Sequence, residues 1–413
     1  MTLLISFASL FLSVVLLQLS SGGVGPLDAL SGIALNFTTA EIGMLGSSHF
    51  VGFFIGCWWA PRLMGSVGHT RAFAAFTALG AIGLLAHMLL IDAYAWAVMR
   101  IATGICVAGA FTVIESWLQA SVTNETRGRA MGTYRLADMG AALVAQLIIS
   151  VLEPASYVSY NLLALLCCAA LLPLTLSRRS QPETPEAPRL HPKLAWDRSP
   201  LAVAGVIVSA LSGASFRMVG PVYGEGVGLE IDQIALFLAT FILGGVLSQY
   251  PVGWLADKFD RRWVLIGLSV AAVFSCAATV MIQGHGTTGV MINIFIFGVT
   301  TYPIYSVSAA HAHDFAENSE RVELSAALMF WYAVGAIAAP YLASKLMVAY
   351  GSTALFAMIA VGHIVLVIFG LTRMRARPTA ENRTRFIYAP RTSFMIGRLL
   401  GRSREENLRG QDD

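Results

Sequence analysis

The chain alternates long apolar runs with short polar connections. A helix that crosses the hydrocarbon layer of a membrane needs about 20 mainly apolar residues. Twelve segments meet this requirement, which predicts an all-α polytopic membrane protein. The expected spans are 4–23, 43–62, 72–91, 96–118, 131–152, 157–177, 200–222, 234–255, 263–283, 288–309, 323–345 and 353–373.

Two polar stretches divide this pattern. Residues 178–199 contain Pro182, Pro185, Pro188 and Pro192 among charged residues, which disfavours a continuous helix and favours a solvated cytoplasmic linker. The linker separates a six-helix bundle at 1–177 from a second at 200–373. Residues 374–413 form an arginine-rich cytoplasmic tail; its stretch 394–400 is expected either to lie on the membrane surface or to be disordered.

Arginine and lysine occur in the connections of one side only. That side carries Arg62, Arg71, Arg127, Arg129, five basic residues of the linker, Lys258, Arg261, Arg262, Arg321 and the tail. Connections on the opposite side, such as 20–41, 153–156 and 283–288, contain none. Because basic connections stay in the cytoplasm, both termini are expected to be cytoplasmic, in a multi-pass protein of the inner or plasma membrane.

The two halves resemble each other at an offset of about 195 residues, as the repeats of transporter folds do. Gly25-Pro26 recurs as Gly220-Pro221. Further matches relate Gly104, Asn124, Arg127, Ala141 and Ala145 to Gly298, Asn318, Arg321, Gly335 and Ala339. Small residues four apart also let neighbouring helices approach closely, which explains several of these matches without any function.

Composition excludes several classes of protein. The residues are 56% hydrophobic and 12% charged, and the net charge of +3 is too small and scattered for nucleic-acid binding. Five cysteines, all in apolar runs, do not suggest a disulfide framework. The sequence lacks the phosphate-cradling loop of an ATPase, a nucleophile elbow and a zinc-protease motif. We therefore expect no enzyme and no cofactor. No metal is expected either, because His311 and His313 are two residues apart and face different sides of a helix.

Charged residues inside a span are costly and are treated as functional candidates. Arg135 and Asp138 share a helix face, either as a structural ion pair or as a proton-transfer site whose carboxylate has an adjustable pKa. Arg217 either binds a solute anion or reaches the outer headgroups. Polar or aromatic contacts to a solute, or simple packing, are expected of Gln18, Tyr134, Tyr302, Tyr305, Trp331 and Tyr332.

The run from Gly253 to Arg262 resembles the loop signature of the major facilitator superfamily, in which a glycine, an aspartate and basic residues join two spans. Asp260 stands where that pattern usually has glycine, and the counterpart at 61–71 has lost the aspartate. Arg100, with Gly104 and Ala108, is similar to the arginine motif of the family's fourth span. Residues 113–116 and 127–129 resemble the YcaD-like branch.

This resemblance implies two six-helix bundles around a central cavity lined mainly by spans 1, 4, 7 and 10, working by alternating access. It also implies that Asp257 docks at the start of a span in the opposite half. We further expect Arg261 to bridge to Asp314, and Glu115 to pair with Arg127 or Arg129. A static surface ion pair is the alternative. The complete expected gate is Glu115, Arg127, Arg129, Gly253, Asp257, Lys258, Arg261, Arg262 and Asp314.

These features predict a transporter of a small organic solute such as an anion, either secondary active with protons as the coupling ion or facilitative. Its partners would be the solute, the lipid bilayer and protons, without a required oligomer. A drug or metabolite efflux antiporter is an alternative, disfavoured because residues 141–146 lack the family's glycine-proline-glycine cluster. A membrane sensor or scaffold with a transporter-like fold is an alternative from another class.

Overall fold

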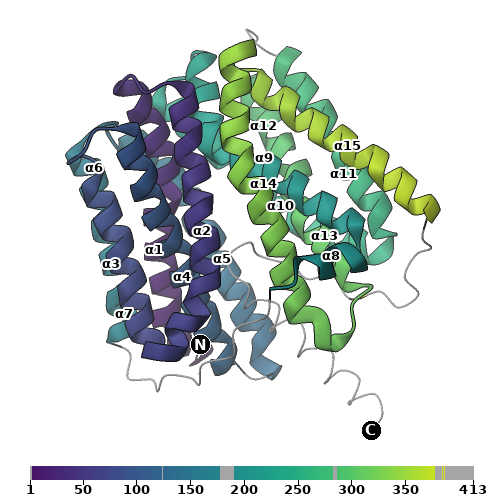
Figure 1. Cartoon of the computed structure of the whole chain (residues 1–413), viewed down its shortest axis with the longest axis horizontal. Coiled ribbons are helices and arrows are strands. Elements are labelled where there is room, and N and C mark those ends of the chain that lie inside the picture. Colours follow the sequence, from purple (N-terminus) through teal and green to yellow (C-terminus); the bar gives the residue numbers. More distant parts are fainter. Residues whose placement is uncertain are drawn as a thin grey trace.

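A computed structural model describes residues 2–122, 124–176, 190–281, 286–376, 384 and 386. Within these residues the chain is helical and has no strand (Figure 1). The helices of the first half are α1 (Thr2–Ala34), α2 (Thr39–Val67), α3 (His69–Ala86), α4 (Ala93–Ser121), α5 (Asn124–Ile148), the 3₁₀ turn Ile149–Val151, α6 (Tyr157–Ala169) and α7 (Leu171–Thr175).

The second half begins after a short helix. Its helices are α8 (Pro192–Arg198), α9 (Pro200–Gly226), α10 (Ile231–Lys258), α11 (Arg261–Met281), α12 (Thr287–Thr301), α13 (Ile304–His313), the 3₁₀ turn Asn318–Glu320, α14 (Arg321–Tyr350) and α15 (Ala354–Ala376). Twelve spans in the described residues are long and apolar enough to cross a membrane, with α6 and α7 forming one span and α12 and α13 another. The predicted all-α polytopic fold is confirmed.

The helix ends follow from capping residues. Thr38 and Glu41 form a capping box at the start of α2, in which each side chain accepts a hydrogen bond from the other residue's backbone N–H. Asp92 accepts bonds from the N–H groups of Tyr94 and Ala95 at the start of α4. Such caps satisfy amide groups that have no partner within the helix. They fix where each span meets its connection.

Matching glycine contacts hold the helices of each half together. A Cβ at Gly52 would overlap the carbonyl oxygen of Ile101, and one at Gly104 would overlap that of His49, so α2 and α4 approach at backbone distance. The second half repeats this crossing of α10 and α12 at Gly244 and Gly298. Close approach through small residues is a common way to pack helices in lipid. The halves are therefore alike in packing.

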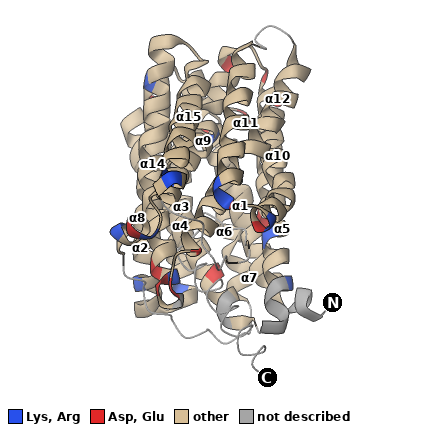
Figure 2. Cartoon of the chain, turned by 90° about the vertical axis from the view of Figure 1, so that its right-hand side faces the viewer, with Lys and Arg blue, Asp and Glu red and all other residues tan. Residues whose placement is uncertain are grey.

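The side of the molecule on which α8 lies is called the linker side here; α9, α11 and α14 begin on it and α15 ends on it. The halves touch at the opposite side, where α2 begins and α14 ends. There Gly43 packs so tightly against Ser344 and the carbonyl of Pro340 that a Cβ would overlap them. The ribbons of the halves diverge toward the linker side (Figure 1). Figure 2 shows most of the charged residues in the part of the molecule nearer this side.

Helix α1 is longer than the sequence predicts. The predicted span ends at residue 23, whereas α1 continues through Pro26 to Ala34. The glycines taken as the end of the span have a packing role: a Cβ at Gly22 would lie 2.9 Å from Ala145 Cβ, and one at Gly25 would lie 3.2 Å from Met218 Sδ. The extension places Asp28 inside a helix rather than in a connection.

Parts of the linker and tail cannot be compared with the prediction. Residues 177–189 and 394–400 lie outside the described residues. The last part of the linker is the seven-residue helix α8, which starts at Pro192, where proline is well tolerated because the first helical N–H has no partner within the helix. Thr384 and Phe386 are the described residues of the tail beyond α15.

Candidate functional site: a central cavity and a buried charged cluster

A cavity lies between the two halves, with about 160 Å³ open to water molecules. Its walls come from α1, α2, α4 and α5 on one side and from α9, α10, Tyr302 and α14 on the other. The polar side chains in the walls are Gln18, Ser21, His49, Asp138, Gln146, Arg217, Tyr302 and Tyr332. The structure thus brings together five residues that the sequence suggested for a solute path: Gln18, Asp138, Arg217, Tyr302 and Tyr332.

Arg217 is the basic side chain that the second half contributes to the wall. Its Nε donates to the carbonyl of Gly213, one turn earlier in α9, at 3.2 Å, and its Nη2 lies 3.5 Å from the hydroxyl of Tyr332. The residue is exposed, so part of the guanidinium still has room for a ligand. Asp138 faces the same cavity from α5. The walls therefore carry opposite charges, one from each half.

The remaining predicted path residues lie outside these walls. Tyr134 is buried and donates its hydroxyl to Glu115 Oε1 at 2.8 Å, while Arg135 stacks on the Tyr134 ring. Tyr305 packs edge-on against Tyr332. Trp331 donates its indole N–H to the carbonyl of Pro192 at 3.0 Å, which ties α14 to α8. These residues position neighbours of the cavity.

The sequence analysis missed a buried charged cluster in the first half. Asp28 is 2% exposed. One of its carboxylate oxygens accepts a hydrogen bond from the Tyr160 hydroxyl at 2.8 Å and lies 3.6 Å from His87 Nε2; the other lies 3.2 Å from Arg100 Nε. Three residues, from α4, α6 and the end of α3, thus meet at the carboxylate that Asp28 contributes from α1. A buried charge of this kind needs such partners.

His87 is held in one orientation. Its Nδ1 lies 2.6 Å from the carbonyl oxygen of Gly83, which can only accept, so Nδ1 carries a hydrogen. The ring stacks on Tyr160, and the backbone carbonyl of His87 accepts a bond from the Trp96 indole at 2.8 Å. Nε2 therefore faces Asp28 and holds a second hydrogen only in the charged imidazolium. The two charge states of the His87 and Asp28 pair therefore differ by one proton.

The cluster adjoins the central cavity. Arg100 Nη2 lies 3.7 Å from Met218 Sδ, and Met218 is part of the cavity wall. A small second cavity is lined by both Arg100 and His49, and His49 also lines the central one. His49 is another residue that the sequence analysis missed. Arg100 itself was expected from its motif, but its partner Asp28 was not.

The expected gate residues lie at the linker side. Arg261 Nη1 is 2.6 Å from Asp314 Oδ1 and also donates to the carbonyl of Ala310 at 2.9 Å. Arg261 Nη2 lies 3.4 Å from Asp257 Oδ1. Lys258 sits over the ring of Trp254. Arg262 binds both carboxylate oxygens of Asp260, the residue that replaces glycine in the motif.

In the first half, Glu115 is buried and bonded to Tyr134. Arg129 is exposed at the start of a span, and the side chain of Arg127 lies outside the described residues. The expected pairing of Glu115 with either arginine stays a prediction.

Two residues of the tail bind directly to this gate. The N–H and hydroxyl of Thr384 donate to Asp314 Oδ1 at 2.7 and 2.9 Å, and the N–H of Phe386 donates to Asp257 Oδ1 at 2.6 Å. Arg261 donates in turn to the carbonyl of Thr384. The ring of Phe386 covers Gly253, where a Cβ would lie 2.8 Å from it. The tail therefore binds the carboxylate of Asp257, which the family pattern expects to dock at the start of a helix in the opposite half.

Comparisons with known proteins agree with this architecture. The sequence model of the Major Facilitator Superfamily matches residues 10–204 and 201–404. The chain has the fold of a membrane transporter, and it belongs to the Major Facilitator Superfamily.

Similar curated proteins are themselves of unassigned substrate. An uncharacterised MFS-type transporter of Enterobacter sp. (strain 638) is 28% identical over 346 residues, which cover 83% of this chain and 89% of that protein. The uncharacterised MFS-type transporter YcaD of Salmonella heidelberg (strain SL476) is 29% identical over 333 residues, covering 79% and 84%. The resemblance to the YcaD-like branch is confirmed.

Solved structures share the fold at low sequence identity. The nucleoside transporter NupG superimposes with a TM-score of 0.74 at 15% identity, covering 90% of this chain and 99% of that one. A D-xylose-proton symporter gives a TM-score of 0.67 at 15% identity, covering 92% and 99%. A bacterial homologue of the human lysosomal transporter Spinster, in an inward-facing and occupied conformation, gives 0.70 at 15%, covering 93% and 98%.

Proposed function

We propose that this chain is a secondary active transporter that moves a small organic anion or zwitterion by alternating access, coupled to protons. The observation that carries the proposal is the central cavity at the junction of the halves, with Arg217 on one wall and Asp138 on the other. Membership of a transporter family supports membrane transport as the general activity. The charged walls give the class of solute.

The solute class follows from the geometry of Arg217. A guanidinium binds a carboxylate or phosphate through two parallel hydrogen bonds, and these bonds are strong where water is scarce. Tyr332 and Tyr302 add hydroxyl groups from the same half, while Asp138 would attract an ammonium group from the other side. An amphoteric metabolite would match both walls. A solute that contacts both halves also favours the state in which they close around it.

The mechanism also depends on which side of the molecule is open and on which side of the membrane that side lies. The halves meet at the side opposite the linker through Gly43, Ser344 and Pro340. With the basic connections in the cytoplasm of a cell whose inner or plasma membrane holds the protein, this is a cytoplasm-open state. Asp257, Arg261 and Asp314 form a gate that changes partners when the cytoplasmic side closes. In the present state the tail residues Thr384 and Phe386 occupy that gate.

Proton coupling would use the Asp28 cluster. Because Nδ1 of His87 is committed to Gly83, a proton entering the pair resides either on Asp28 or on His87 Nε2. Loss of that proton strengthens the attraction of Asp28 for Arg100, which touches the cavity wall at Met218. The solute and the proton would thereby influence each other through α1, α4 and α9. A protein with the same fold is a D-xylose-proton symporter.

The experiment begins with the purified protein in detergent. A thermal-unfolding screen against carboxylates, phosphate esters, amino acids and sugars identifies ligands, because a ligand that binds the folded state raises the unfolding temperature. The best ligand is then supplied to proteoliposomes with an imposed pH gradient. We expect accumulation that collapses when a protonophore removes the gradient.

Arg217→Gln provides the test of the site, with Arg62→Gln as the matched control. Arg62 is an exposed arginine of α2 whose Nη1 donates to the carbonyl of Trp58. We expect the Arg217 variant to lose ligand stabilisation and uptake, and the Arg62 variant to keep both. Ligand binding without any uptake in the wild type would instead identify a sensor. Equal behaviour of the two variants would remove Arg217 from the solute site.

A further inference from the structure

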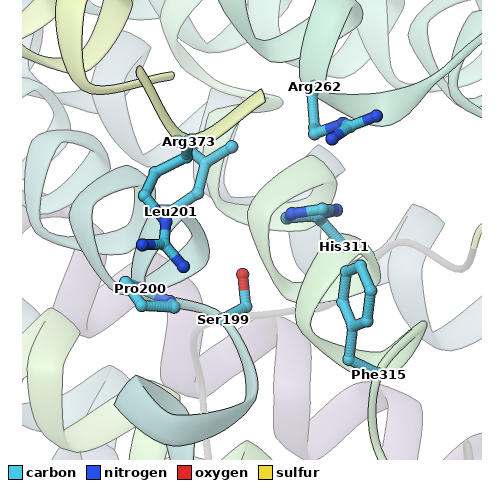
Figure 3. A pocket seen from close by; sticks show the side chains of 7 residues that line it. All are labelled: Ser199, Pro200, Leu201, Arg262, His311, Phe315 and Arg373. Carbon is cyan, nitrogen blue, oxygen red and sulfur yellow. The ribbon is translucent and has the colours of Figure 1, made fainter. Parts of the chain in front are cut away.

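A second polar pocket lies at the linker side, outside the solute site. It is lined by Ser199, Pro200, Leu201, Arg262, His311, Phe315 and Arg373. Figure 3 shows the guanidinium of Arg373, the hydroxyl of Ser199 and the ring of His311 directed toward a common space, with Arg262 above them. These residues lie at the start of α9, at the start of α11, in α13 and the connection after it (Phe315), and in the last turn of α15.

The pocket has a positive balance of charge. Arg262 is neutralised by Asp260, whose two oxygens accept its bonds at 2.6 to 3.1 Å. Arg373 makes no hydrogen bond or ion pair to the part of the chain that the structure describes. Its charge therefore stands without a counter-charge among the residues that line the pocket. Besides the neutralised Arg262, the side chains of Arg373, Ser199 and His311 carry possible hydrogen-bond donors around one space, and the lining contains no acidic residue. This arrangement suits an anion.

The hydroxyl of Ser199 contributes a second donor. Its oxygen accepts a bond from the N–H of Ala202 at 3.1 Å and so caps α9, which leaves the hydroxyl hydrogen for another group. The side chain is fixed there, because the residue is 3% exposed. The positive end of the 27-residue helix α9 adds to the attraction for an anion.

The position of the pocket along the spans favours a lipid headgroup over a free anion. The spans Pro200–Gly226, Arg261–Met281, Thr287–His313 and Ala354–Ala376 all have the pocket at their polar end. This is the level at which an apolar span gives way to the headgroup layer of a bilayer. Leu201 and Phe315 add apolar surface beside the charged groups. Basic pockets between spans at this level are suited to acidic lipid headgroups.

We infer that this pocket binds the phosphate of an anionic phospholipid, with Arg373 as its main partner and the Ser199 hydroxyl as a second donor. The bound lipid would join the end of α15 to the starts of α9 and α11. It would thereby stabilise the linker side of the second half. The inference does not depend on the solute or on proton coupling.

The test uses the whole chain, purified in a neutral detergent and titrated with short-chain phosphatidylglycerol, phosphatidylcholine or inorganic phosphate. Binding is followed by native mass spectrometry and by the shift in unfolding temperature. Arg373→Gln is compared with Arg375→Gln, which removes the same charge from an exposed residue of the same helical turn that does not line the pocket. We expect phosphatidylglycerol to bind the Arg373 variant about five- to ten-fold more weakly, in keeping with one basic contact at a membrane surface.

The outcomes separate the possible sources. Stabilisation by phosphatidylglycerol and not by inorganic phosphate, reduced only in the Arg373 variant, supports the lipid site. Stabilisation by inorganic phosphate alone, lost in the same variant, keeps the anion site and rejects the lipid as its occupant. Equal lipid binding by the two variants would overturn the inference. If Arg373→Gln fails to fold, Ser199→Ala takes its place, with unfolding without lipid as the reference.

Discussion

The two halves are related in sequence and packing, but they fill the same interior position with different chemistry. The offset of 195 residues that relates Gly25-Pro26 to Gly220-Pro221 places Asp28 opposite Tyr223, and it places Tyr160 opposite Leu355, next to Phe356. In the first half these positions form a charged cluster around Asp28. In the second half Tyr223 and Phe356 pack edge to face with ring centroids 4.8 Å apart, beside Phe216 and Phe237.

This difference shows how a duplicated fold can divide its work. A charged cluster can change state with one proton, whereas an aromatic cluster has no such freedom and gives stable packing. Under the proposed function, the first half would hold the proton-coupling groups, and the second half contributes Arg217 to the cavity from an aromatic framework. The proposals can be tested by changing equivalent positions in both halves.

The largest effect is expected at Asp28. Asp28→Asn leaves the buried guanidinium of Arg100 without its carboxylate, and breaking one partner of a buried pair costs about 3 to 5 kcal/mol. We expect a marked loss of thermal stability in detergent and loss of proton-driven uptake in proteoliposomes.

A double variant separates stability from coupling. Asp28→Asn with Arg100→Met removes both charges, so most of the lost stability should return while coupling stays absent. Proton-driven accumulation at the wild-type rate in either variant would show that Asp28 is not the coupling group.

Glycine substitutions should affect both halves alike. Gly104→Ala and Gly298→Ala each push a Cβ into a backbone carbonyl at equivalent helix crossings, and overpacking of this kind costs about 1 to 3 kcal/mol or more. We expect similar falls in the unfolding temperature of the two variants. Gly140→Ala is the control, because a Cβ there meets nothing within 4 Å. A large effect in only one half would contradict the symmetry of packing.

Exchanging the two ring types tests the division of chemistry directly. Tyr160→Phe removes a bond to the Asp28 carboxylate, and Phe356→Tyr places a hydroxyl in an apolar cluster; each change should cost about 1 to 3 kcal/mol. Both should lower the unfolding temperature, but only Tyr160→Phe should shift the pH dependence of uptake. Tyr157→Phe at the exposed start of α6 should change neither. Unaltered pH dependence in Tyr160→Phe would argue against the cluster as the proton site.

The smallest effect is expected at an ion pair near the surface. Arg198 donates to Glu320, and this hydrogen bond lowers the pKa of Glu320 below its ordinary value of 4.5. Because the folded pKa is the lower one, the stabilisation is complete above the unfolded value and disappears as the pH falls through the folded value.

Glu320→Gln should therefore cost less than about 1 kcal/mol at pH 7, since the pair is partly exposed and screened. The difference from the wild type should shrink as the pH is lowered below 4.5, and thermal unfolding across this pH range measures it. A difference that grows on acidification would contradict the pairing.

Much of the fold follows from hydropathy, because lipid imposes a minimum length on every span. The predicted end of the first span, at residue 23, was wrong for a physical reason. Glycine and proline usually end a helix in water, whereas both are tolerated within a span, and glycine lets helices approach, as Gly22 does against Ala145. That error placed Asp28 in a connection and hid the charged cluster. The mostly apolar run from Leu27 to Ala34, which Asp28 and Ser31 interrupt, was the signal that could have revealed it.

The cavity walls were predictable only in part. A charge inside a span, such as Asp138 or Arg217, is expensive in lipid and can be selected from sequence. An aromatic residue has no such penalty, so hydropathy does not distinguish Tyr302, which lines the cavity, from Trp331, which bonds to Pro192. Histidines 49 and 87 follow no spacing rule. Their roles depend on contacts between helices far apart in sequence.

The contact between the tail and the gate has a practical consequence for anyone who handles this protein. Affinity tags and fluorescent fusions are commonly placed after the last span of a transporter, and in the segment after α15 Thr384 and Phe386 bond to Asp314 and Asp257. A bulky fusion or a proteolytic cut at these residues would disturb their bonds to Asp314 and Asp257, two residues of the proposed gate. Rates obtained with such altered ends should be compared with those of the unmodified chain.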